Sequence, residues 1–85
     1  MKEILFYSNN ISKIIDIIKE LGEGCNGIAP TPYGIRKHKF EIEVFNLNNQ
    51  LVFNGYLFKD FKTFVKVLKQ LKNGIIRYSC TLHPY

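Results

Sequence analysis

The chain has 85 residues, of which 46% are hydrophobic and 14% aromatic, so it holds a single domain, residues 1–85, and is too apolar for a disordered tail. Twelve Lys and Arg residues outnumber seven Asp and Glu residues, which gives a formal net charge of +5. The sequence has no P-loop, G-x-G-x-x-G, Cys-x-x-Cys or G-x-S-x-G motif, so it carries none of the usual signatures of nucleotide, redox or esterase chemistry.

The first part of the chain predicts a strand, a helix and a long loop. Residues 4–7 form a short apolar run, and residues 8–10 after it are favourable helix N-caps. Apolar residues then recur at the spacing of one helical face: Ile11, Ile14, Ile15, Ile18 and Leu21. Gly22 and Gly24 stand where a helix C-cap is expected, and the Gly and Pro residues of 23–36 predict a loop.

The second part predicts a hairpin, a second helix and a last strand. From Lys37 on, apolar and polar residues alternate as in a half-buried strand, and an Asn-rich turn leads to a returning strand over 51–58. We expect Asp60 to cap a helix over 61–71, and residues 75–82 to form the last strand.

This order, β-α-β-β-α-β, predicts an α+β fold of the ferredoxin-like (split β-α-β) kind, with an antiparallel sheet and two helices on one face. A weak internal repeat agrees with two related halves. Residues 11–21 align with residues 61–71, and every apolar position matches.

Charge is distributed unevenly along the chain. Residues 1–35 contain three Lys and Arg against four Asp and Glu, whereas residues 36–85 contain nine against three. A localised basic surface suits nucleic acid, anionic lipid or an acidic protein. Because ten of the basic residues are lysines, we expect contacts to a phosphate backbone rather than to base edges.

Two clusters are the candidate binding residues. One is a stripe on the second helix, opposite its apolar face, formed by Lys59, Lys62, Lys66 and Lys69. The other lies where the predicted loop meets the hairpin and is formed by Arg36, Lys37, His38 and Lys39. The alternative for both clusters is a solvated face that only improves solubility.

No metal or cofactor is expected. The Cys and His residues are Cys25, His38, Cys80 and His83, and only the last two have the spacing of metal ligands. Two cysteines are too few for a secreted disulfide framework, so we expect Cys80 to be a thiol in the core.

Catalysis has little support in the sequence, and we expect the protein not to be an enzyme. His38, between two lysines, offers a general base for RNA cleavage. No paired carboxylates and no nucleophile-base pair accompany it. A small ribonuclease or toxin is therefore the alternative function.

With both helices on one side of the sheet, alternate strand residues face an open side. We assign Tyr7, Phe45, Tyr56 and Phe58 to this side. Their exposure would favour a homodimer or a tight partner complex. The alternative is that the loop over 23–36 folds across them.

The leading hypothesis is a non-enzymatic interaction module whose basic surface binds nucleic acid or occupies a nucleic-acid-binding protein. A phage or mobile-element inhibitor fits its size and its richness in Ile, Lys, Asn, Phe and Tyr. A structural homodimer is the third reading. The sequence shows no signal peptide and no apolar run of membrane-spanning length, so we expect a cytoplasmic protein with no membrane contact.

Overall fold

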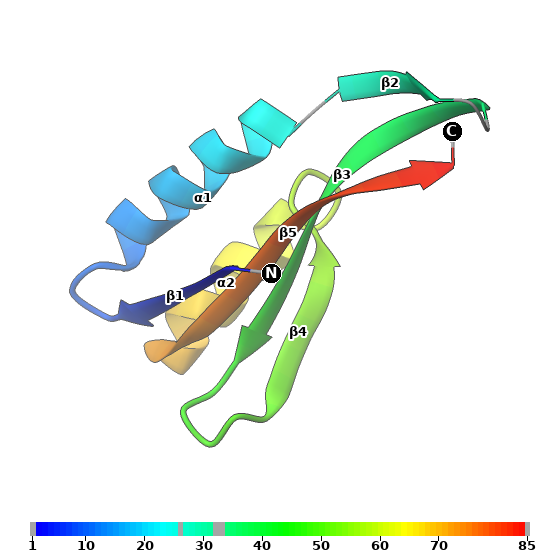
Figure 1. Cartoon of the computed structure of the whole chain (residues 1–85). Coiled ribbons are helices and arrows are strands. Elements are labelled where there is room, and N and C mark those ends of the chain that lie inside the picture. Colours follow the sequence, from blue (N-terminus) through cyan, green and yellow to red (C-terminus); the bar gives the residue numbers. More distant parts are fainter. Residues whose placement is uncertain (1, 26, 32–33, 85) are drawn as a thin grey trace.

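A computed structural model describes the backbone of residues 2–25, 27–31 and 34–84, and the side chains of residues 2–25 and 39–80. The elements in this part of the chain are, in order, β1 (Lys2–Tyr7), α1 (Ile11–Cys25), β2 (Gly27–Thr31), β3 (Gly34–Phe45), β4 (Leu51–Tyr56), α2 (Phe61–Leu71) and β5 (Asn73–Pro84) (Figure 1).

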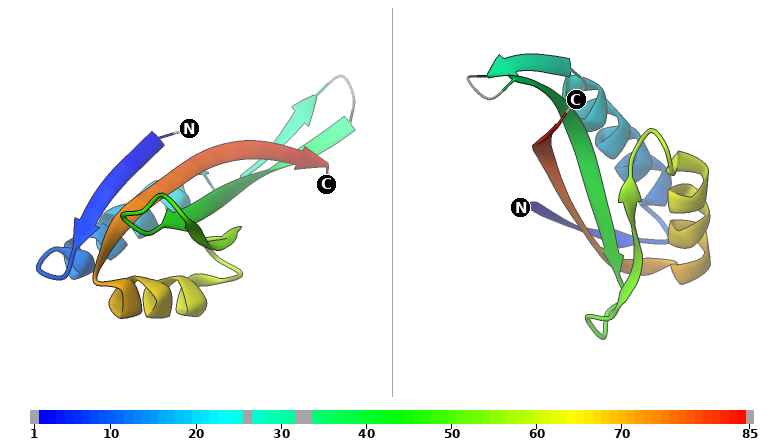
Figure 2. Two further views of the ribbon diagram at one scale, coloured as in Figure 1. Left: turned by 90° about the horizontal axis from the view of Figure 1, so that it is seen from below. Right: turned by 90° about the vertical axis from the view of Figure 1, so that its right-hand side faces the viewer.

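The strands form one antiparallel sheet with the order β1-β5-β3. The outer edge of β3 is shared, because β2 pairs with its first half and β4 with its second half. Both helices pack on the same face of this sheet (Figure 2). The predicted α+β domain, with an antiparallel sheet and two helices, is therefore confirmed.

The strand order differs from the ferredoxin-like order, in which the first strand of each β-α-β half is central. Here β1 and β4, the first strands of the two halves, lie at the edges, and β5 and β3 are central. The central strands are also the longer ones. The two central strands have 12 residues each and pair over ten positions, whereas β1 and β4 have six residues each.

The Gly/Pro-rich stretch over 23–36 is not the predicted loop. Helix α1 continues to Cys25, and β2 then pairs with the start of β3, from Gly27 opposite His38 to Thr31 opposite Gly34. Proline is tolerated in edge strands, and β2 is an edge strand. With the end of β5, these strands form an arm that extends past the helices (Figure 1). The suggestion that this stretch folds across the open face is therefore wrong.

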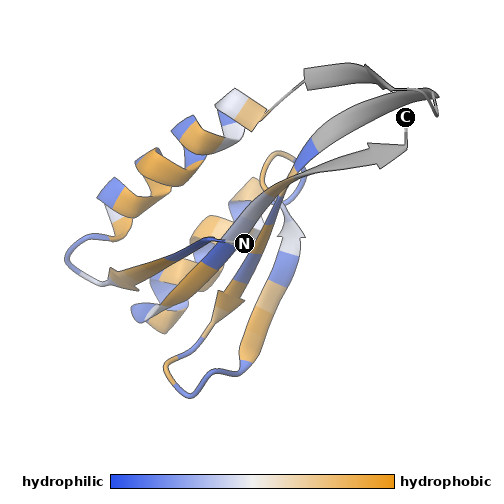
Figure 3. Cartoon of the chain, in the orientation of Figure 1, coloured by the Kyte–Doolittle hydropathy of each residue, from blue (hydrophilic) through white to orange (hydrophobic). Residues whose placement is uncertain are grey.

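The core lies between the sheet and the helices. Alternate residues of β3 are buried, as the period-two pattern predicts, and the apolar stripe of each helix faces them (Figure 3). The largest fully buried side chains come from every layer: Phe6, Phe64, Ile18, Ile42, Leu57, Leu68, Ile76 and Val44.

Two glycines in the last turn of α1 respond oppositely to the same substitution. A Cβ on Gly22 would overlap the side chain of Leu57, whereas a Cβ on Gly24 has no neighbour within 4 Å. We expect Gly22→Ala to lower the free energy of unfolding by about 1–3 kcal/mol through overpacking. Gly24→Ala should raise it by about 0.5–1 kcal/mol, because alanine is the better helix former. Urea titration of both variants measures the two shifts, and equal shifts would contradict the packing of α1 on Leu57.

Candidate basic binding surfaces

Helix α2 and the turn before it present the lysine stripe to solvent. Phe64 and Leu68 are buried beneath the helix, and the four lysines of the stripe are exposed. The helix contains no Asp or Glu, and none of the four lysines forms an ion pair with a residue whose side chain is described. No ion pair with a described side chain therefore neutralises them.

Asp60, the acidic residue nearest the stripe, is used in a turn. It occupies the N-cap position of α2, but its side chain makes no capping hydrogen bond. Instead its Oδ2 accepts a hydrogen bond from the N–H of Tyr56 at 2.9 Å, and its own N–H donates to the carbonyl of Tyr56. The expected side-chain cap is therefore wrong, since the carboxylate closes the turn that carries Lys59. A Cβ on Gly55 would crowd this carboxylate, which explains the glycine there.

The second cluster lies in the arm, away from α2 (Figure 1). Backbone pairing places Arg36, Lys37 and His38 on β3 between β2 and β5. Lys39 is the one member whose side chain is described, and its Nζ lies 4.9 Å from the ring centre of Tyr56. Lys39 is therefore placed beside the turn that precedes α2, and the side chains of the other three members lie outside the described residues.

The residues assigned to the open face have different surroundings. Tyr7 is 47% exposed at the end of β1, whereas Tyr56 is half-buried near Lys39. Phe58 is 55% exposed, but it lies in the turn after β4 and not in the sheet.

Phe45 is only 9% exposed, although its face of the sheet carries no helix. The guanidinium carbon of Arg77 lies 4.5 Å from the centre of its ring. Arg77 is held there by Glu3, whose Oε1 accepts a hydrogen bond from Nε at 2.7 Å. An arginine stacked on an aromatic ring shields it while remaining hydrated itself. The pairing of β1 with β5 places Glu3 opposite Arg77, and the sequence alone gives no sign of this contact.

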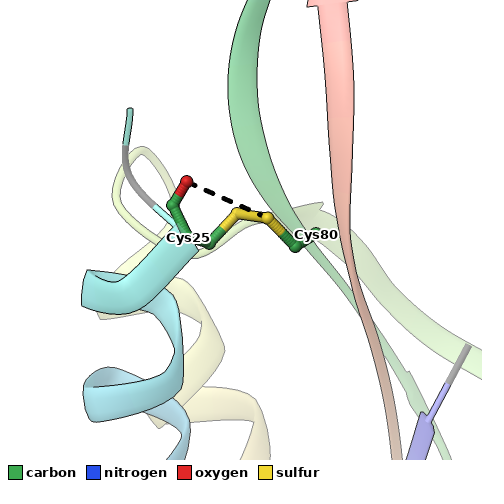
Figure 4. The surroundings of a disulfide bond; sticks show 2 residues. All are labelled: Cys25 and Cys80. Carbon is green, nitrogen blue, oxygen red and sulfur yellow. Dashed lines mark hydrogen bonds between the residues drawn. A yellow bond between two sulfur atoms is a disulfide. The ribbon is translucent and has the colours of Figure 1, made fainter. Parts of the chain in front are cut away.

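Cys25 and Cys80 form a disulfide, with their Cα atoms 5.8 Å apart (Figure 4). The expected free thiol at Cys80 is therefore wrong, and both sulfurs are unavailable to a metal. The bond joins the last residue of α1 to β5 at the base of the arm. Helix α1 does not end at its glycines and continues to Cys25. On β5, Ile76 and Tyr78 face the core, and Cys80 is the next residue in this alternating series.

The disulfide counts against the expected cytoplasmic location, because cytosolic thiols are kept reduced. The described residues include no helix long and apolar enough to cross a membrane. Their side chains also include no group of three or more His, Cys, Asp or Glu that is arranged to hold a metal ion.

Comparison with protein-family models, with curated proteins and with solved structures finds no significant match.

Proposed function

We propose that the protein is a non-enzymatic module that binds the phosphate backbone of nucleic acid through the lysine stripe of α2. The supporting observation is the exposure of Lys62, Lys66 and Lys69 on a helix that has no acidic residue, together with that of Lys59 in the turn before it. From Lys62 to Lys69 the stripe extends about 10 Å along the helix axis, which matches the length of about three base pairs.

Nucleic acid is favoured over the channel of a nucleic-acid-binding protein. Such channels are themselves positively charged, so they would repel a chain with a net charge of +5. Lysine acts as a point charge and suits phosphate without base selection. The proposal therefore includes affinity for both DNA and RNA, with little sequence preference.

The salt dependence of duplex binding tests whether the lysine stripe contacts phosphates. Affinity of the wild-type protein for a fluorescent 20-mer duplex should fall with salt, by about 0.9 log units per log unit of salt for each phosphate contact. Replacing Lys62 and Lys66 together by Ala should reduce this slope by about two. Fluorescence anisotropy titrations at several salt concentrations, from low to physiological, measure the affinity and therefore this slope.

A matched control removes the same charge from α1. Lys13 and Lys19 are exposed there but stand among Asp16 and Glu20. Replacing both by Ala should change the slope by less than one. No binding of duplex or single strands at low salt, or equal slopes for the two double variants, would contradict the proposal.

A homodimer through the open face stays a prediction. In the structure Tyr7 and Phe58 offer exposed aromatic area, whereas Phe45 is shielded by Arg77.

A further inference from the structure

The turn between β4 and α2, residues 57–60, is fixed at both ends (Figure 1). Leu57 is buried, and its N–H donates a hydrogen bond to the carbonyl of Phe40 on β3 at 3.0 Å. At the other end, the N–H and the carboxylate of Asp60 each form a 2.9 Å hydrogen bond with the backbone of Tyr56. A turn that is held in this way loses little further entropy when a ligand binds to it.

This turn presents an aromatic ring to solvent. Phe58 is 55% exposed, although its neighbour Leu57 lies in the core. Three other rings have a cation over one face: Phe45, Phe61 and Tyr56. No described side chain places a cation over Phe58. The ring of Phe58 is therefore available to a planar ligand.

Lysines lie both in this turn and beside it. Lys59, the first lysine of the stripe, directly follows Phe58 and is exposed. Lys39 reaches the turn from β3, where its Nζ contacts the ring of Tyr56. A single exposed apolar side chain is common on protein surfaces. An exposed ring among lysines, however, is the combination by which proteins hold single-stranded nucleic acid, since the ring stacks a base and the lysines attract phosphates.

We infer that an unpaired base of a single-stranded nucleic acid stacks on Phe58 while neighbouring phosphates contact the lysine stripe. This inference rests on the proposed function and names its substrate class, a single strand rather than a duplex. In a duplex the bases are stacked on one another, and exposing one to the ring costs unstacking and unpairing energy. Every base has a face that suits the ring, so the stacking adds affinity without adding sequence preference.

The spacing of the two groups suits one nucleotide. The Cα atoms of Phe58 and Lys59 are about 3.8 Å apart, as in any pair of consecutive residues. The base and the phosphate of one nucleotide can therefore reach the ring and the first lysine of the stripe together.

The test compares three fluorescent probes: an oligothymidylate of about 12 nucleotides, an abasic strand with the same number of phosphates, and a duplex of the same length. We expect the wild-type protein to bind the oligothymidylate about fivefold or more tightly than the abasic strand at equal salt, the scale of one stacked base. Phe58→Ala should abolish this difference and leave the affinities for the abasic strand and the duplex unchanged. Fluorescence anisotropy titrations measure all three affinities.

The outcomes separate this inference from the proposed function. Unchanged oligothymidylate binding by Phe58→Ala, while replacing Lys62 and Lys66 by Ala still weakens all three probes, would overturn the stacking and leave the phosphate contacts standing. Equal affinity of the wild-type protein for the oligothymidylate and the abasic strand would do the same. No binding of any probe would overturn both.

Matched variants test whether the aromatic ring itself is required. Phe58→Leu keeps an apolar side chain without a ring, so it should bind the oligothymidylate as weakly as Phe58→Ala. Tyr7→Ala removes a ring of similar exposure, 47%, at the end of β1 and should leave this binding unchanged. Wild-type affinity of Phe58→Leu, or equal losses for Phe58→Ala and Tyr7→Ala, would overturn the inference.

A tryptophan at this position reports the stacking directly. The chain contains no tryptophan, so Phe58→Trp has a single one. Its fluorescence should be quenched by the oligothymidylate and not by the abasic strand, and its affinity should equal or exceed that of the wild type. Unchanged fluorescence at saturation would overturn the inference. So would a wild-type dimer, seen by sedimentation, that Phe58→Ala dissociates, because a second copy would then cover the ring.

Discussion

Reduction of the Cys25–Cys80 disulfide should lower the free energy of unfolding by about 4 kcal/mol. The two cysteines are 55 residues apart in sequence, and closing a loop of this length removes about that much conformational entropy from the unfolded chain. A domain of this size has a total stability of about 4–13 kcal/mol. The loss is therefore a third of the stability or more.

Urea titration with and without a phosphine reductant measures this effect. The double variant Cys25→Ser/Cys80→Ser is the control, because it should be as unstable as the reduced protein and insensitive to reductant. Thiol titration of the untreated protein should find no reactive thiol. Two free thiols before reduction, or an unchanged midpoint after complete reduction, would contradict the expected stabilisation.

Phe64→Ala should lower the free energy of unfolding by about 3–5 kcal/mol, because it leaves a cavity at the centre of the core. Phe64 is fully buried on α2, and its ring centre lies 6.1 Å from that of Phe53 on β4 and 6.5 Å from that of Phe61. Truncation removes contacts between the helix and the sheet and also within the helix.

Phe58→Ala is the matched control, because it removes the same atoms from a ring that is 55% exposed. Its expected effect is within about 1 kcal/mol. Urea titration of both variants compares them at constant m-value. Similar losses for the two would show that α2 does not pack on the sheet through Phe64.

The sequence predicts the elements that have a clear period. The helical spacing of α2 matches its observed bounds at Phe61 and Leu71, and the alternation in β3 identifies its buried residues. Periodicity reports which side of an element is buried but not which strand lies beside it. The strand order is therefore not predicted by periodicity. The strands predicted from Lys37 and over 75–82 are also shorter than β3 and β5, which extend farther into the arm.

The predictions of a helix end and of a loop are wrong at positions where glycine can serve more than one structural role. Gly22 and Gly24 were expected to end a helix, but Gly22 permits the close approach of Leu57, and the helix continues. A helix that ends at these glycines leaves Cys25 in a loop, away from the core. The sequence prediction therefore does not bring Cys25 close to Cys80. The glycines and prolines after it also suggested a loop, although an edge strand accommodates both.

The candidate site was predictable to different degrees. The exposure of the α2 lysines follows from helical spacing alone, and the structure places them as expected. The shielding of Phe45 by Arg77 requires β1, β3 and β5 to be adjacent, so no local pattern reveals it.

The pairing of β1 with β5 also constrains the time course of folding. In the described chain β1 pairs only with β5, so that Ile4, near one end, is opposite Ile76, near the other. During synthesis at about 5–20 residues per second, the first strand waits several seconds for its partner. Contacts this distant in sequence also slow the folding of a complete chain. Until β5 emerges, the apolar residues of β1 therefore have no sheet partner in the described chain.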